Sequence, residues 1–206
     1  IRTFKNISKE LEVLRNLEVK KLEESPNCFI KRPSSIDNIA YGAMVELQIL
    51  FQNPGTKEID ELITDSITLS CYESHTKNPF DSDSEDFKRF KSLVSEQDLV
   101  HMMGLYNWID KDINASLAKW NKLFSDVKVF DKDWDDAGGD LMNKFDILNT
   151  IRKSCTNFNL SYHEVLKMPY GLIQASSFSD ATRYFIQDRI KTAVESRMKA
   201  EREKHK

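Results

Sequence analysis

Glycine and proline are both scarce in this chain, which has only six glycines and five prolines among its 206 residues. Sandwiches and barrels of β-strands need such residues at many turns, so their scarcity favours long, uninterrupted helices. Long hydrophobic runs are missing as well, because no stretch approaches the roughly 18 apolar residues of a membrane-spanning helix. The sequence therefore predicts an all-α protein, and we expect no membrane partner.

Cysteine is also rare. The three cysteines, Cys28, Cys71 and Cys155, are odd in number, lie far apart and form no CxxC motif. This pattern favours reduced thiols within the core over disulfides or a metal site.

Net charge is small, at −3, so we do not expect the whole molecule to bind nucleic acid electrostatically. The charges are nevertheless unevenly placed. Seven Lys or Arg and three Glu lie between Arg189 and Lys206, whereas residues 131–140 are strongly acidic. A nucleic-acid-binding role could rest only on the basic C-terminal helix, where glutamates interrupt the positive charge.

Catalytic motifs are absent: the chain has no Gly-rich phosphate loop and no GxSxG. The nearest candidate is HEVLK at residues 163–167, which differs from the zinc-binding HExxH because Lys167 replaces the second histidine. Ser161 and Glu164 have the S-x-x-E spacing of a capping box, and Pro169 excludes continuation of a helix beyond Met168. We therefore assign structural roles to Ser161, Glu164 and Pro169, and predict no enzyme, metal site or cofactor.

Two acidic segments, residues 81–86 and 131–140, were compared with calcium-binding loops. An EF-hand loop starting at Asp131 needs glycine at its sixth position and glutamate at its twelfth, but Asp136 and Met142 occupy these positions. Both segments are interpreted as solvated loops, and cation binding by either stays an open alternative.

Apolar residues recur at helical spacing and predict a bundle of about seven helices in a single domain. The longest predicted helix is a central one that is capped by the Ser95-x-x-Asp98 pattern and is roughly 40 Å long. Its expected inward stripe consists of Leu99, Met103, Tyr106, Ile109, Ile113, Leu117, Trp120 and Phe124. At most a minor extended piece is expected near residues 127–130.

The remaining predicted helices are shorter and are separated by turn residues. They cover residues 6–24, residues 35 or 37 to 50, residues 56–67, residues 87–93, residues 141–155, and residues 177 or 179 to 198. Residues 72–86 show no helical period and are expected to form a loop. The predicted organisation is an N-terminal helical arm (1–30), a helical core (31–170), and a connection followed by a basic helix (171–206).

The candidate partner-binding surface lies after Pro169. A linker between two helices is normally polar, but residues 170–178 include several large apolar side chains. We therefore predict that this segment and the basic end contact a protein partner. The predicted contact residues are Tyr170, Leu172, Ile173, Phe178, Arg197, Lys199 and Arg202.

Three segments resemble tail proteins of tailed phages, of the tail-assembly-chaperone or baseplate-hub kind. They are RPSSIDNIAYGAMVELQ from Arg32, LYNWIDKDINASLAKWNKLFSDVKV from Leu105 and NLSYHEVLKMPYGLIQ from Asn159. The resemblance covers about residues 32–189 and concerns patterns of residue type. It implies a non-enzymatic structural or tail-assembly protein, found in the virion or host cytoplasm, without cofactor or small-molecule substrate. Its implied partners are other phage tail or connector proteins, and it implies a homo-oligomer or ring in the particle.

Other interpretations stay open at this point. The chain could be a head-to-tail connector or ring protein of the virion, a cellular helical adaptor unrelated to phage, or a weak nucleic-acid-binding helical protein. An enzyme whose nucleophile and base meet only in the folded chain is a further alternative.

Overall fold

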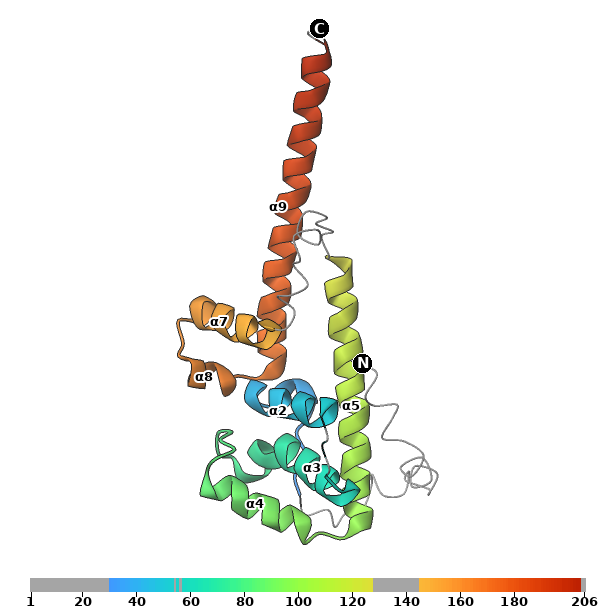
Figure 1. Ribbon diagram of the computed structural model, residues 1–206, viewed down its shortest axis with the longest axis vertical. Coiled ribbons are helices and arrows are strands. Elements are labelled where there is room, and N and C mark those ends of the chain that lie inside the picture. Colours follow the sequence, from blue (N-terminus) through green and yellow to red (C-terminus); the bar gives the residue numbers. More distant parts are fainter. Residues whose placement is uncertain (1–29, 54, 56, 128–144, 205–206) are drawn as a thin grey trace.

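The computed structural model describes residues 30–53, 55, 57–127 and 145–204. Within these residues the chain forms seven α-helices, one 3-10 turn and no strand, which confirms the predicted all-α fold (Figure 1). The elements are η2 (Ile36–Asn38), α2 (Tyr41–Gln52), α3 (Ile59–Thr76), α4 (Glu85–Ser95), α5 (Leu99–Asp126), α7 (Asp146–Phe158), α8 (Tyr162–Leu166) and α9 (Tyr170–Lys204).

Helix α3 forms the centre of the core, because α2, α4 and α5 all pack against it. Every residue from Leu62 to Tyr72 is buried. Two of its small polar residues bond to their own helix: the hydroxyls of Ser66 and Thr68 each donate to the carbonyl four residues earlier, at 2.7 Å. A helix that is covered on all sides shows no polar face.

This full burial explains an error in the predicted boundaries. We expected the helix to end near Ile67 and a loop to begin at Tyr72, but α3 continues to Thr76. It ends at Lys77, which has a left-handed conformation with φ 67°. Thr68 to Tyr72 lack a period because they are buried on every side, whereas the polar residues 73–76 are half-buried and continue the helix without an apolar stripe.

Helix α5 matches the predicted long helix closely, spanning 28 residues from Leu99 to Asp126. Asp98 caps it by accepting a hydrogen bond from the Val100 amide at 2.8 Å. Most of the predicted stripe is buried or packs against the core. Leu99 is the exception, since it is 57% exposed and Met102 is buried in its place.

The predicted helix beginning at Ser35 or Asp37 is instead two elements. Ser35 caps η2 by accepting from the Asp37 amide, and α2 begins only at Tyr41. Between them, the Tyr41 amide donates to the Met168 carbonyl at 2.7 Å, and the Tyr170 amide donates to the Ile39 carbonyl at 2.8 Å. This short antiparallel bridge requires extended backbone and so interrupts the helix.

Helix α8 begins with the predicted capping box. Ser161 accepts from the Glu164 amide, while the Glu164 carboxylate accepts from the Ser161 amide at 2.8 Å. The helix ends at Leu166, before Pro169, as predicted.

The predicted connection after Pro169 is wrong. Helix α9 begins directly at Tyr170 and runs for 35 residues, so no linker precedes the helix expected at Ser177 or Ser179. Proline is well suited to the start of a helix, where its missing N–H needs no partner and its fixed φ is already helical. Its carbonyl accepts from the amides of Leu172 and Ile173, at 3.0 and 3.3 Å.

Helix α7 is present, but its buried face differs from the predicted one. The expected apolar stripe is Leu141, Phe145, Leu148, Ile151 and Cys155. Ile151 and Cys155 do pack inward, whereas Phe145 is 49% and Leu148 is 56% exposed, and Leu141 lies outside the described residues. The side chains that pack inward are Ile147, Ile151, Ser154, Cys155 and Phe158. Both sets have helical spacing, so periodicity alone could not separate them. The predicted helix at residues 6–24, the extended residues 128–130 and the acidic loop 131–140 lie outside the described residues.

Gly171 lies where α9 meets η2. A Cβ atom at this position would lie 2.9 Å from the Cβ of Asp37 and 3.1 Å from its carbonyl oxygen. Contacts this short to backbone force either α9 or η2 to move.

We therefore expect Gly171→Ala to lower the free energy of unfolding by about 1–3 kcal/mol, the usual range for overpacking. In an unhindered helix the same change would add up to about 1 kcal/mol of stability. Urea unfolding followed by circular dichroism measures the effect, with Ser179→Ala at an exposed site of α9 as the control. A Gly171→Ala protein as stable as the parent would contradict this account of the junction.

Candidate functional site

The predicted contact residues do not form one surface. Tyr170 is 3% and Ile173 is 0% exposed, so both belong to the core. Phe178 packs edge-on against Phe124 of α5, with ring centroids 5.8 Å apart. Among the four predicted contact residues between Tyr170 and Phe178, only Leu172 is open to solvent, with 46% of its surface exposed. The apolar character of residues 170–178 reflects a helix packed into the core and does not mark a binding linker.

Tyr170 shows how deep this part of α9 lies. Burial, together with the nearby Asp37 carboxylate and the Tyr41 hydroxyl, raises the pKa of its phenol. Its ring stacks on Tyr41 with centroids 6.3 Å apart.

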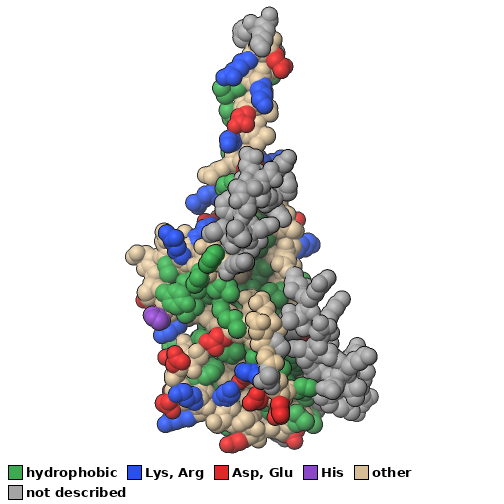
Figure 2. All heavy atoms as spheres, viewed as in Figure 1, with side chains coloured by type: hydrophobic (Ala, Val, Ile, Leu, Met, Phe, Trp, Pro, Cys, Tyr) green, Lys and Arg blue, Asp and Glu red, His purple; other side chains and the backbone are tan. Residues whose placement is uncertain are grey.

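The other three predicted contact residues, Arg197, Lys199 and Arg202, lie on the part of α9 that projects beyond the other described elements (Figure 1). We call residues 189–204 the α9 extension; at 1.5 Å per residue it is about 24 Å long. Every residue from 189 to 203 is exposed. Figure 2 shows Lys, Arg and Glu side chains interspersed with hydrophobic ones along it.

Large apolar side chains on and just before the α9 extension are about half exposed. They are Tyr184, Ile186, Ile190, Val194 and Met198, with exposed fractions between 46% and 58%. Scattered exposed apolar residues are common on protein surfaces, but here Ile190, Val194 and Met198 lie on the α9 extension, against which no described helix packs.

A second apolar surface lies on the body of the molecule. Figure 2 shows hydrophobic side chains gathered on this face at the level of α7 and α8. Exposed apolar residues of this region include Phe145 and Leu148 at the start of α7 and Tyr162 on α8. Helical periodicity alone does not reveal this surface, because Phe145 and Leu148 have the spacing of core residues.

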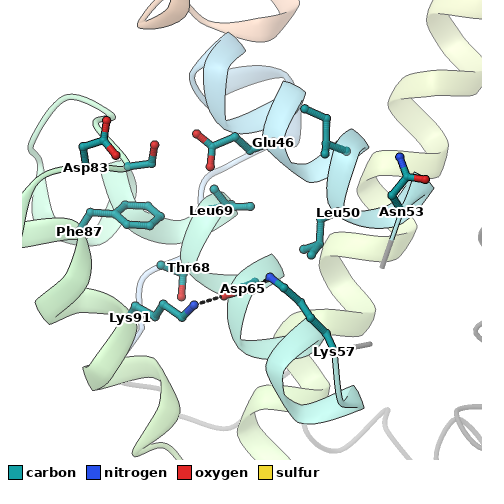
Figure 3. Close-up of a pocket in the computed structure, with 12 residues that line it drawn as sticks. Glu46, Leu50, Asn53, Lys57, Asp65, Thr68, Leu69, Asp83, Phe87 and Lys91 are labelled. Carbon is teal, nitrogen blue, oxygen red and sulfur yellow. Dashed lines mark hydrogen bonds and ion pairs between the residues drawn. The ribbon is translucent and has the colours of Figure 1, made fainter. Parts of the chain in front are cut away.

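A hollow of about 490 Å³ opens between α2, α3 and α4, and Figure 3 shows the side chains that line it. Asp65 of α3 lies in its wall, with a side chain only 11% exposed. Lys57 and Lys91 approach it from two sides, and their ammonium groups donate to the Asp65 carboxylate at 2.5 and 2.6 Å.

Burial alone would raise the pKa of Asp65, but the hydrogen bonds and charges of the two lysines outweigh it and hold the pKa below its usual value. The lysines thus allow a carboxylate to remain ionised inside the wall of the core. This cluster joins α3 to α4 and to the segment before α3.

Glu46 of α2 lies at the rim of the same hollow and also lines a second hollow of about 560 Å³, beside α8. Burial raises the pKa of Glu46; the Ser82 hydroxyl acts in the opposite direction, and Asp83 adds to the rise. Glu46 and Asp83 make the rim of the first hollow acidic, whereas its far wall around Asp65 holds two lysines.

Sequence analysis missed this cluster. A charged residue between Ile63 and Ile67 signals a buried charge that needs a partner. Lys91 belongs to another helix, so its identity as that partner emerges only from the fold.

Within the described residues, no group of three or more His, Cys, Asp and Glu side chains is placed to hold a metal ion. His163 and Lys167 line the second hollow and are exposed. Among the described helices, none is long and apolar enough to cross a membrane.

Comparison with protein-family models, with curated proteins and with solved structures finds no match to this chain.

Replacing Asp65 by Asn should lower the free energy of unfolding at pH 7 by about 1–2 kcal/mol, because two charged hydrogen bonds are lost while the lysines regain solvent. The folded-state pKa of Asp65 lies below 3.8, so its ionised form stabilises the fold above that pH. The contribution is lost as the pH falls through the folded-state pKa.

Urea unfolding at pH 7 and at pH 3 tests this: the difference between Asp65→Asn and the parent should shrink at the lower pH. Asp126→Asn, at an exposed position of α5, is the matched control and should change stability by less than about 0.5 kcal/mol at both pH values. A difference that is constant with pH would show that the lysine pairs do not stabilise the fold.

Proposed function

We propose that this chain is a non-enzymatic structural or assembly protein of a tailed phage, and that it acts through protein–protein contacts made by the α9 extension. The observation that supports the contact role is the extension itself. It is a helix with no described neighbour, and large apolar side chains project from it.

Exposed apolar side chains on an isolated helix contribute nothing to the stability of the monomer. Full burial of one Val, Ile or Met side chain is worth about 1.5–3 kcal/mol, and half of that area is still open here. Amphipathic helices bind partners through apolar residues three and four positions apart. The spacing of Ile186, Ile190, Val194 and Met198 meets this requirement.

The phage assignment is supported by the resemblance of residues 32–189 to tail-assembly-chaperone and baseplate-hub proteins. The structure adds that the resembling segments meet in space. Residues 39–41 of the first form the bridge to residues 168–170 of the third, and Asp37 of the first contacts the second through Ser116. The three segments together form one folded unit from which the extension projects.

Removing the α9 extension by ending the chain at Asp188 should abolish assembly while the body remains folded. Of the deleted residues, 189–203 are exposed and lie beyond the core, so the melting temperature of the body should change little. Complementation of a phage deleted for this chain, scored by infectious titre and electron microscopy of tails, measures assembly. The control is Lys88→Ala with Arg89→Ala on the exposed face of α4. Full complementation by the truncated chain would contradict the role of the extension.

The copy number of the protein in purified phage particles distinguishes a permanent component of the particle from a factor that acts only during assembly. A fixed, ring-like copy number in particles would indicate a connector or hub subunit. Absence from particles, combined with tail defects on deletion, would indicate an assembly chaperone. Absence from particles with normal tails would contradict the phage proposal.

A further inference from the structure

The α9 extension has an ordered surface when its residues are sorted into rows four positions apart. One row is apolar and consists of Ile186, Ile190, Val194 and Met198. The next row around the helix is charged and alternates in sign: Lys191, Glu195, Lys199 and Glu203. Rows of residues four apart form the ridges that interdigitate in the commonest class of helix packing.

The alternating row forms no hydrogen bond or ion pair with the described body of the molecule. All four side chains are exposed, and none forms an ion pair with another described residue. Neighbours four apart along this row could pair within the helix, but such exposed pairs are worth only about 0.3–0.5 kcal/mol. These charges therefore remain available to a partner.

Because the charges alternate in sign along this row, each charge meets an opposite charge when the row is aligned with the same row of a second copy that runs in the opposite direction. Two identical helices related by a two-fold axis can pack antiparallel. A row at the edge of their contact then faces the same row of the second helix, which runs in the opposite direction. With the axis near residues 196 and 197, Lys191 faces Glu203 of the second copy and Glu195 faces Lys199. Both pairs join opposite charges.

The apolar row agrees with the same axis. Val194 and Met198 of one copy then lie opposite Met198 and Val194 of the other, which places the large side chains at the centre of the contact. The apolar row is centred on residue 196 and the charged row on residue 197, so the two rows indicate nearly the same axis.

We propose that the partner of the α9 extension is the extension of a second copy of this chain, paired antiparallel about a two-fold axis near residues 196 and 197. This inference rests on the proposed function, since it names the first partner of the extension. The contact is short and weak, which suits a subunit that exchanges between a free and an assembled state.

Charge reversal of the full-length chain tests the pairing. Lys191→Glu with Lys199→Glu makes the row entirely acidic, and Glu195→Lys with Glu203→Lys makes it entirely basic. Sedimentation velocity over a range of concentrations should show the parent passing from 24.0 kDa toward twice that mass. Each variant alone should dimerise about tenfold or more weakly, which corresponds to about 1.4 kcal/mol. An equimolar mixture should restore dimerisation, and added salt should weaken it.

Two further variants separate pairing from loss of the helix. Val194→Ala with Met198→Ala removes the apolar row but retains strong helix formers, so it should weaken dimerisation while the helical signal at 222 nm is unchanged. Lys122→Glu with Arg152→Glu makes the same charge change outside α9 and should leave dimerisation as in the parent.

A parent chain that stays monomeric, or a mixture that associates no better than the separate variants, would overturn the antiparallel pairing. The proposed function is tested separately, by whether the chain ending at Asp188 supports tail assembly. If truncation abolishes assembly and the parent is monomeric, the extension binds a different protein.

Discussion

The two hydrogen bonds between residues 39–41 and 168–170 determine how the rest of the described structure is arranged. They form an antiparallel bridge between Ala40 and Pro169, two positions far apart in the sequence. One side of the bridge begins α2 and the other begins α9, so the starts of both helices are held at one point. Glu73 adds the third connection, because its carboxylate accepts from the amides of Ala40 and Phe80, each at 3.0 Å. Burial raises the pKa of Glu73, and these amides act in the opposite direction.

Asp37 extends the same junction to α5. Its carboxylate accepts from the Ser116 hydroxyl at 2.5 Å, from the Lys119 ammonium at 2.6 Å and from the Trp120 indole at 3.2 Å. Burial would raise the pKa of Asp37, but these donors outweigh it and lower it. Four helices therefore meet around a few extended residues, and Gly171 fits there because it has no side chain to displace Asp37.

Features that depend on local chemistry could be predicted from the sequence. The caps at Asp98 and Ser161 use side chains within three residues of the amides they bind, and the long stripe of α5 repeats over many turns. Features that depend on distant partners could not. The bridge at Ala40 splits a predicted helix, and the burial of α3 on all sides removes the period that marks a helix. In the candidate site, Asp65 is recognisable as an inward charge, whereas its pairing with Lys91 requires α4 to be packed on α3. Pro169 was ambiguous because the same residue can follow one helix and begin the next.

The junction also explains how a helix without neighbours can persist beyond the body. Isolated helices of about 12–15 residues are marginal in water because forming the first turn is unfavourable. Here that turn forms at Pro169 and Tyr170, and packing of Ile173 and Phe178 stabilises the turns that follow. The last described polar contact between α9 and another helix is at Asp180, which accepts from Asn157 at 2.8 Å and pairs with Lys153 at 3.1 Å. Beyond it the helix only has to propagate, through residues rich in Lys, Glu, Arg and Ala, which are good helix formers. Because α9 is continuous through body and extension, a partner bound to the extension is held in a defined orientation relative to the junction.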